Sequence, residues 1–197
     1  MMLIQFAPIQ KEIPIDRQER SKKQPDSLDV SGNSCFFSSD PNGVMTKHLG
    51  KLITGQDKHY WSYGNYNMMR LIFWILEQTG PAEIIISTYS ISPKTLQGII
   101  NRREKGIIKD IRFIIDNRVR SLSPKPFALL ATNFKYRCTS IHAKVACIWN
   151  ESWKISVVSS QNATDNPKIE RGTIYTSPEV FKFDKRILED VFESGTT

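Results

Sequence analysis

A strand–helix–strand unit near the middle of the chain constrains the fold more than any other feature. The apolar run at 84–86 predicts a buried strand over residues 83–90, and residues 111–116 predict a second buried strand. Between them, Pro93 is well placed as the first residue of a helix, and Gly106 ends it. A connection of this length lets the chain reverse its direction, so we expect the two strands to be parallel.

The flanking sequence adds helices and strands around this unit. Apolar residues at helical spacing predict the helices, and alternating or continuous apolar runs predict the strands. The predicted helices are 66–78, 123–132 and 177–193, and the predicted strands are 137–148, 154–160 and 172–176. Together these elements predict an α/β fold in which helices sandwich a mixed β-sheet.

The first 43 residues differ from the rest of the chain. They mix charges with Pro14 and Pro25, show no sustained periodicity and end in two runs of turn-forming residues. We therefore expect an extended or poorly ordered N-terminal arm over residues 1–43, with room for a short strand. Residues 44–197 are expected to form one folded domain.

The same sequence predicts a cytoplasmic protein with no membrane partner, no metal and no cofactor. No apolar run approaches the ~20 residues that span a bilayer, and residues 1–9 lack the basic start of a signal peptide. Three cysteines are too sparse for a disulfide framework, and no CxxC or HxxxH pair is present to hold zinc.

Positive charge is concentrated in one part of the chain. The formal net charge is +7, and residues 94–137 hold eleven basic and three acidic residues, a difference of +8. Such a concentration favours a polyanionic partner, here DNA or RNA, although any one of these residues can belong to a solvated helix face. The residues expected to contact nucleic acid are Arg102, Arg103, Arg118 and Arg120.

A histidine, a lysine, two small polar residues and a carboxylate follow one another in the C-terminal half. In a strand, His142 and Lys144 share one face, while the apolar residues between and after them enter the core. Ser160 and Asn162 are also two residues apart, and the turn after them brings Glu170 back. These groups suit a phosphodiester: an imidazole can attack phosphorus, polar groups can stabilise the developing charge, and a carboxylate can orient the imidazole.

Five residues resemble, in order and spacing, the phospholipase D superfamily signature HxK(x4)D, G-[GS]-x-N and a glutamate: His142-x-Lys144, Ser160-x-Asn162 and Glu170. The resemblance covers about half of the chain. It implies a phospholipase D-like fold and metal-independent phosphodiester cleavage through a phosphohistidine. It also implies that His142 is the nucleophile or general acid and that Glu170 orients it. The implied phosphate-binding residues are Lys144, Ser160 and Asn162.

Two positions depart from that signature. Trp149 stands where the family has its aspartate, and Ser159 replaces the glycine that precedes the serine. Strand alternation points residue 149 away from the face of His142. The loss of the aspartate is therefore expected to affect local support more than the reacting groups.

The chain holds one histidine–lysine motif, whereas an active site of this family needs two. The other histidines, His48 and His59, have no lysine two residues later and are interpreted as surface or hydrogen-bonded side chains. The resemblance therefore implies a homodimer, in which a two-fold axis brings two copies of His142 to one phosphate.

Two further segments have alternative interpretations. Residues 59–66 are rich in aromatic rings, which can stack on the bases of a single strand or dock the first helix onto the sheet. Packing is the preferred interpretation. Residues 116–118 follow a strand end, where the sites of α/β proteins often lie, and a simple turn is the preferred interpretation.

These observations predict a hydrolase: a metal-independent, endonuclease-like phosphodiesterase that cleaves DNA or RNA. The alternative is a catalytically weak or inactive nucleic-acid-binding module of the same fold, which Trp149 in place of the aspartate suggests. A phospholipid hydrolase is less favoured, because the sequence shows no amphipathic membrane helix.

Overall fold

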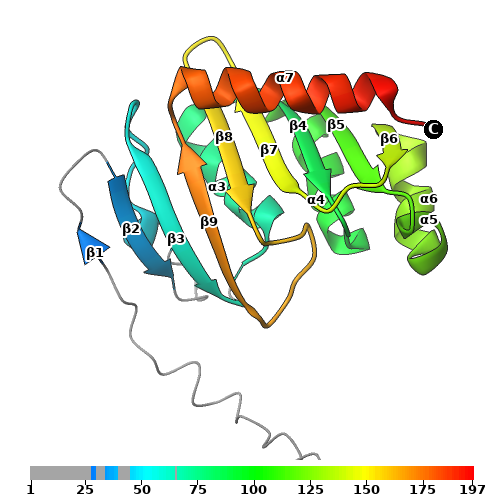
Figure 1. The fold of residues 1–197 in the computed structure, drawn as a ribbon, viewed down its shortest axis with the longest axis horizontal. Coiled ribbons are helices and arrows are strands. Elements are labelled where there is room, and N and C mark those ends of the chain that lie inside the picture. Colours follow the sequence, from blue (N-terminus) through cyan, green and yellow to red (C-terminus); the bar gives the residue numbers. More distant parts are fainter. Residues whose placement is uncertain (1–27, 30–33, 40–44, 65) are drawn as a thin grey trace, which may run out of the picture.

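The computed structural model describes residues 28–29, 34–39, 45–64 and 66–197. The strands in these residues are β1 (Leu28–Asp29), β2 (Ser34–Ser39), β3 (Asp57–Tyr63), β4 (Ala82–Thr88), β5 (Ile108–Asp116), β6 (Lys135–Thr139), β7 (Lys144–Trp149), β8 (Lys154–Ser159) and β9 (Ile169–Tyr175). The helices there are α2 (Met45–Leu49), α3 (Met68–Thr79), α4 (Pro93–Glu104), α5 (Val119–Leu122), α6 (Pro124–Asn133) and α7 (Pro178–Ser194). The strands form one mixed sheet in the order β1-β2-β3-β9-β8-β7-β4-β5-β6 (Figure 1).

The predicted strand–helix–strand unit is confirmed as β4, α4 and β5. The two strands are parallel neighbours, with Ile84 paired to Ile111. The Ser92 side chain caps α4 by accepting a hydrogen bond from the Thr95 backbone N–H, and Pro93 is the first helical residue. Because β5 runs parallel to β4, α4 carries the chain back along the sheet, from the edge where β4 ends to the opposite edge, where β5 begins. The first turn of α4 therefore lies at the edge where β4 and β5 end.

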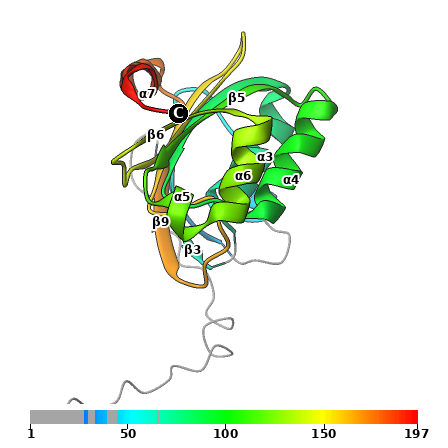
Figure 2. The ribbon, with the colours of Figure 1, turned by 90° about the vertical axis from the view of Figure 1, so that its right-hand side faces the viewer.

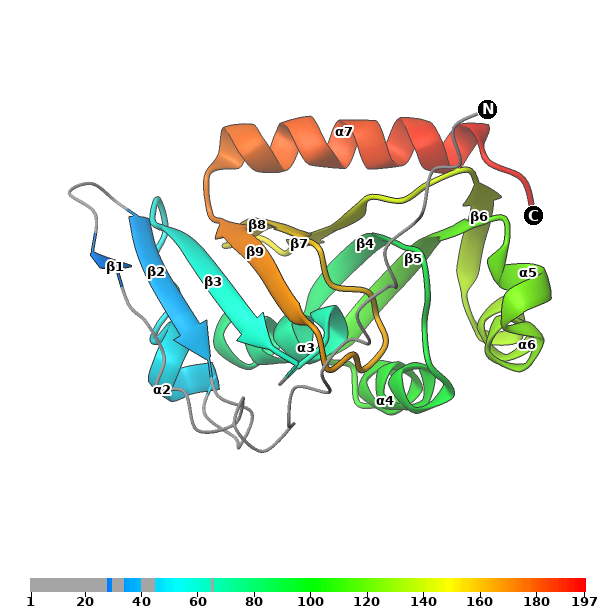
Figure 3. The same ribbon diagram turned by 60° about the horizontal axis from the view of Figure 1, so that its bottom comes forward.

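Helices cover both faces of the sheet, as predicted. α7 crosses one face, and α3, α4 and α6 lie on the other (Figure 2, Figure 3). Alternation along β4 serves both layers: Ile84 and Ile86 belong to the larger core with α3 and α4, and Ile85 belongs to a smaller core beneath α7. None of the helices in the described residues combines the length and apolar character that crossing a membrane requires.

The predicted strand over residues 137–148 is wrong, because this segment forms two strands in different parts of the sheet. β6 ends at Thr139 and pairs with β5, while β7 begins at Lys144 and pairs antiparallel with β4. Residues 140–143 carry the chain past the ends of β5 and β4, which lie between β6 and β7. The alternation of side chains indicates extended backbone on either side of this crossover, but it cannot say which strand each part joins.

On the N-terminal side, the aromatic stretch forms β3, a strand that the sequence did not predict and that lies between β2 and β9. Tyr60 is buried in the larger core, which supports the packing interpretation. Most of the predicted arm over residues 1–43 lies outside the described residues, and within it β1 and β2 continue the sheet. His59 is hydrogen-bonded to Thr173, whereas the side chain of His48 lies outside the described part.

Candidate active site

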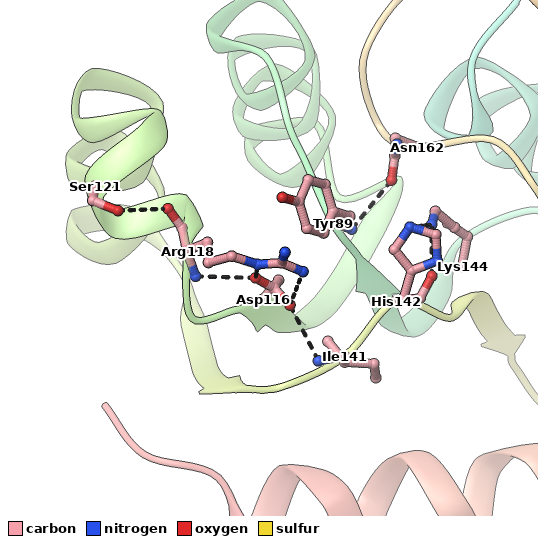
Figure 4. A network of polar contacts seen from close by, with 8 residues as sticks. All are labelled: Tyr89, Asp116, Arg118, Ser121, Ile141, His142, Lys144 and Asn162. Carbon is pink, nitrogen blue, oxygen red and sulfur yellow. Dashed lines mark hydrogen bonds and ion pairs between the residues drawn. The ribbon is translucent and has the colours of Figure 1, made fainter. Parts of the chain in front are cut away.

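The predicted catalytic and phosphate-binding residues meet at the edge of the sheet where β4 and β5 end. Residues 140–143 cross this edge from β6 to β7, and residues 160–163 leave β8 towards the loop after β4. Asp116, the last residue of β5, anchors the first crossing, because its Oδ2 accepts a hydrogen bond from the Ile141 backbone N–H at 3.3 Å (Figure 4). His142 therefore lies in an irregular segment, next to an anchored residue.

Lys144 lies against His142. Its Nζ is 3.1 Å from Nδ1 and 3.2 Å from Nε2 of the imidazole, and it donates to the His142 carbonyl oxygen at 2.6 Å. The lysine is 6 % exposed, and burial lowers its pKa, while the negative charges of Glu170 and Asp116 oppose that shift. The imidazole is exposed, so a phosphate can approach it from solvent with the ammonium group already alongside.

Ser160 and Asn162 lie on the segment that follows β8. The last residue of β8 pairs with Lys144. The Asn162 Oδ1 accepts a hydrogen bond from the Tyr89 backbone N–H at 3.2 Å. With its oxygen used in this way, the amide NH2 group of Asn162 is the part that can donate to an anion. Two of the three phosphate-binding residues that the motif implied, Ser160 and Asn162, are therefore brought to the edge of the sheet that holds the third, Lys144.

The hydrogen bonds of Glu170, in β9, go to Ser160 and Asn166. The Ser160 hydroxyl donates to Oε2, and the Asn166 Nδ2 donates to Oε1 at 2.7 Å. The carboxylate also acts on the site through its charge, because it opposes the lowering of the Lys144 pKa. The structure thus shows a glutamate that orients the serine hydroxyl, and its orienting role towards His142 stays a prediction.

A buried network that the sequence did not predict supports the segment after β8. The Tyr60 hydroxyl lies 3.2 Å from Ser159 Oγ and 3.0 Å from Gln161 Oε1, and Gln161 Nε2 donates to the Tyr66 carbonyl oxygen at 2.6 Å. Gly172 makes room for this hydroxyl, since a Cβ there would lie 2.3 Å from its oxygen. Burial raises the pKa of Tyr60, so the phenol stays protonated as a donor.

The turn after β5 also faces the site, although the sequence was interpreted there as a simple turn. Arg118 Nε lies 2.8 Å from Asp116 Oδ1, and Nη2 lies 3.3 Å from Oδ2. The Arg118 guanidinium lies over the Tyr89 ring at 4.8 Å, and the ring centroids of Tyr89 and His142 are 5.6 Å apart. The Arg118 hydrogen bond holds the pKa of Asp116 below its usual range, although burial opposes this shift. The turn therefore orients an arginine beside the candidate site.

The predicted nucleic-acid contacts fall into two places. Arg118 and Arg120 follow the end of β5, where the Arg120 guanidinium lies 5.4 Å from the ring centroid of Phe127. Arg102 and Arg103 lie in the last turn of α4, a helix of 12 residues that is about 18 Å long and begins at the site edge. The structure brings Arg118 to the site and places Arg102 and Arg103 at the opposite edge of the sheet.

The departures from the family signature have clear structural positions. Trp149 is the last residue of β7, where its ring centroid lies 6.1 Å from that of Phe181 and 4.8 Å from Lys185 Nζ, both on α7. The alternation argument is confirmed for Lys144, the first residue of β7, because residue 149 packs with the core beneath α7, and His142 itself lies outside the strand. Ser159 takes part in the buried tyrosine network through its hydroxyl group.

Comparison with known proteins agrees with the fold that the motif implied. No protein-family model and no curated protein sequence matches the chain. Solved structures do match it. Nuc from Salmonella typhimurium, a phospholipase D family member, is 16 % identical with a TM-score of 0.54, over 71 % of this chain and 97 % of Nuc. NucT from Helicobacter pylori is 15 % identical with a TM-score of 0.53, over 72 % of this chain and 99 % of NucT.

A third match is the archaeal chromatin protein TrmBL2, at 12 % identity and a TM-score of 0.51, over 78 % of this chain and 58 % of TrmBL2. Identities this low speak for the fold and leave the activity open. The chain has the phospholipase D-like α/β fold, which confirms the resemblance at the level of the fold.

Proposed function

We propose that this protein is a metal-independent phosphodiesterase that cleaves nucleic acid in an endonuclease-like manner, with His142 as the nucleophile or general acid. The observation that carries the proposal is the grouping of an exposed imidazole, a buried lysine and the Ser160–Asn162 segment at one edge of a phospholipase D-like fold. Each of these groups has a use at a phosphodiester. The segments 140–143 and 160–163 hold them together.

The reaction needs a nitrogen of His142 to attack phosphorus, which forms an N–P bond as the bond to the leaving oxygen breaks. The Lys144 ammonium and the Asn162 amide can donate to the non-bridging oxygens, and Ser160 can join them once its hydroxyl turns from Glu170. A second, protonated imidazole gives the leaving oxygen its proton. The second imidazole, now neutral, takes a proton from water as that water attacks the phosphohistidine; the N–P bond breaks, the phosphate ester leaves and the histidine is restored.

The need for a second imidazole is the reason to propose a homodimer. The sequence has no second histidine–lysine pair, so another copy of this chain would supply the second His142 across a two-fold axis. Light scattering at micromolar concentration is expected to show a dimer. A monomer that cleaves nucleic acid at the same concentration would contradict the shared site.

Charge makes nucleic acid the favoured substrate class. Residues 94–137 have an excess of eight positive charges, and Arg118 from this segment lies over the Tyr89 ring, which is next to the imidazole of the site. A polyanion is attracted to such a surface. TrmBL2, which shares the fold, is described as binding DNA, and this fits the same substrate class.

A nucleic-acid-binding module with weak or no turnover is the second candidate. Trp149 in place of the family's aspartate favours it, and so does the engagement of the Glu170 carboxylate by Ser160 and Asn166. Such a module would keep the basic residues and the fold, while its imidazole would lack an orienting carboxylate.

Plasmid DNA and RNA incubated with the protein in excess EDTA distinguish these candidates. We expect cleavage by the wild type and by a His59→Ala control, and binding without cleavage by His142→Ala. Retarded but intact nucleic acid with the wild type would support the binding module. Equal cleavage by wild type and His142→Ala would contradict the role of His142, and phospholipid vesicles in the same assay test the less favoured lipid substrate.

A further inference from the structure

Arg118 is held in one orientation at the candidate site. Its side chain is 61 % exposed, whereas the side chain of its partner Asp116 is only 2 % exposed. Two side-chain nitrogens of the arginine face the two carboxylate oxygens, and this paired contact fixes the plane of the guanidinium. An ordinary surface ion pair leaves the arginine mobile. Here the buried carboxylate and the ring of Tyr89 hold it from two sides.

The position of this guanidinium relative to the imidazole can be bounded. The guanidinium carbon lies 4.8 Å from the Tyr89 ring centroid, and that centroid lies 5.6 Å from the His142 ring centroid. The two distances together place Arg118 within about 10 Å of the imidazole. Figure 4 shows Tyr89 between the two groups. Asp116 links them further, since it also accepts the Ile141 N–H beside His142.

Part of the guanidinium remains available to a ligand. Arginine has five N–H donors, and Nε and Nη2 are the nitrogens that face Asp116. Nη1 is therefore the group left to donate towards solvent. Asp116 neutralises much of the positive charge of Arg118. The direction of the remaining N–H donors therefore matters more for binding a ligand than the net charge of the pair. A lysine, which is a point charge without this planar fork, could not replace such a contact.

We propose that Arg118 is a second phosphate subsite, which binds the phosphate next to the one that His142 attacks. The proposal rests on the proposed function and makes the substrate a chain with at least two successive phosphodiesters. Neighbouring phosphates of one strand are at least the ~3.4 Å rise per nucleotide apart. A donor within about 10 Å of the imidazole is therefore within reach of a neighbouring phosphate. A single phosphodiester would leave this subsite empty.

Cleavage of short substrates in EDTA tests the subsite. The substrates are bis(4-nitrophenyl) phosphate, a trinucleotide with two phosphodiesters, and the same trinucleotide with either linkage replaced by a neutral methylphosphonate. The variants are Arg118→Ala, Arg118→Lys and the matched control Arg186→Ala. Arg186 is an exposed arginine on α7 that also pairs with a carboxylate, Asp190, and lies over an aromatic ring, Phe183.

For the wild type we expect kcat/KM to fall about tenfold when one linkage is neutral, beyond the factor of two from losing one cleavable bond. On the natural trinucleotide, kcat/KM of Arg118→Ala and Arg118→Lys should be lower than that of the wild type by the same factor. On the trinucleotides with one neutral linkage, these variants should match the wild type. Both should lose much less on bis(4-nitrophenyl) phosphate, which has no second phosphate, than on the natural trinucleotide, and Arg186→Ala should match the wild type throughout. Equal losses on all substrates would overturn the proposal, because Arg118 would then act through the structure of the His142 segment.

A binding measurement separates failure of the subsite from failure of the proposed function. If the wild type cleaves none of the substrates, the phosphodiesterase assignment fails. Fluorescence anisotropy with a labelled 12-nucleotide oligothymidylate still decides the subsite. Affinity about tenfold weaker for Arg118→Ala than for Arg186→Ala supports the contact. Equal affinities of these two variants would overturn it.

Discussion

The two ends of β7 differ in what they do for the molecule. Lys144, its first residue, is buried against His142 at the edge where β4 and β5 end. Trp149, its last residue, packs under α7 with Phe181 and Lys185. Residues five apart in a strand point to opposite faces, and they lie about 17 Å apart along it. The difference shows that one strand can hold a candidate site residue at one end and a residue that packs under a helix at the other.

This separation explains how a tryptophan can stand where the family has an aspartate. The ring of Trp149 helps to dock α7, and Arg112 approaches the same ring at 6.0 Å. Support for the histidine segment comes instead from another strand, through the Asp116 carboxylate and the Ile141 N–H. The candidate site is therefore held by a carboxylate that the family signature does not contain.

Removing the lysine should have the largest effect. Lys144→Ala is expected to lower kcat on an oligonucleotide by ~10²–10³, the usual consequence of losing one donor to a developing oxyanion. The matched control is Lys154→Ala, because Lys154 pairs with Trp149 at the other end of the strand pair. A comparable loss in both variants would show that the two ends of β7 are not functionally distinct.

The same lysine predicts an alkaline limit to activity. Burial lowers the Lys144 pKa, so the charged form is lost at a lower pH than for an ordinary lysine. The rate should fall as pH rises through that lowered pKa. Lys144→Arg cannot lose its proton in this range and should move the fall to higher pH, even if its rate is reduced. A pH–rate profile of both proteins measures this shift, and an unchanged alkaline limb would remove Lys144 as its cause.

At the other end of β7, a substitution should lower the stability of the protein and leave its catalytic rate nearly unchanged. Trp149→Ala is expected to lower the free energy of unfolding by about 2–3 kcal/mol, less than a fully buried tryptophan because the ring is half-buried. Urea unfolding measures this loss, and kcat/KM of the folded variant should stay within about twofold of the wild type. Trp149→Asp should not raise activity, and a gain would show that the missing aspartate limits the site.

The support for the histidine segment should have a smaller effect that depends on pH. Asp116→Asn is expected to cost about 1–2 kcal/mol at neutral pH, through weaker hydrogen bonds to Arg118. The Asp116 pKa is lowered in the folded state, so its contribution is present above the ordinary aspartate range and is lost as pH falls through the lowered value. The difference from wild type in urea unfolding should shrink in acid. A constant difference would mean that the carboxylate charge is not involved.

The smallest effects are expected at the opposite edge of the sheet. Arg102 and Arg103 pack over Phe73 and Phe134 at the end of α4. Arg102→Ala and Arg103→Ala should leave kcat unchanged and weaken nucleic-acid binding less than Arg118→Ala does. The slope of log affinity against log salt checks this. If the magnitude of this slope falls by about one for either variant, that arginine contacts a phosphate, as the sequence predicted.

Local patterns in the sequence predicted most of the fold. The apolar run at 84–86 and the helix limits at Pro93 and Gly106 predicted the correct parallel pair, because burial and helix ends depend on neighbouring residues. The crossover at 140–143 was missed because the partner of a strand is chosen by the whole sheet. β3 was missed because its aromatic stretch was interpreted only as stacking or docking side chains.

In the candidate site, too, the sequence predicted one part and the tertiary structure decided the other. Sequence alone selected His142, Lys144, Ser160, Asn162 and Glu170, since their types and spacing are visible in one dimension. Only the tertiary structure decided their support, because the contacts join distant residues: Tyr60 and Gln161 are 101 residues apart, and Tyr89 and Asn162 are 73 apart. The sequence thus determined which groups are available for chemistry. Long-range packing decided how they are held and which arginine lies beside them.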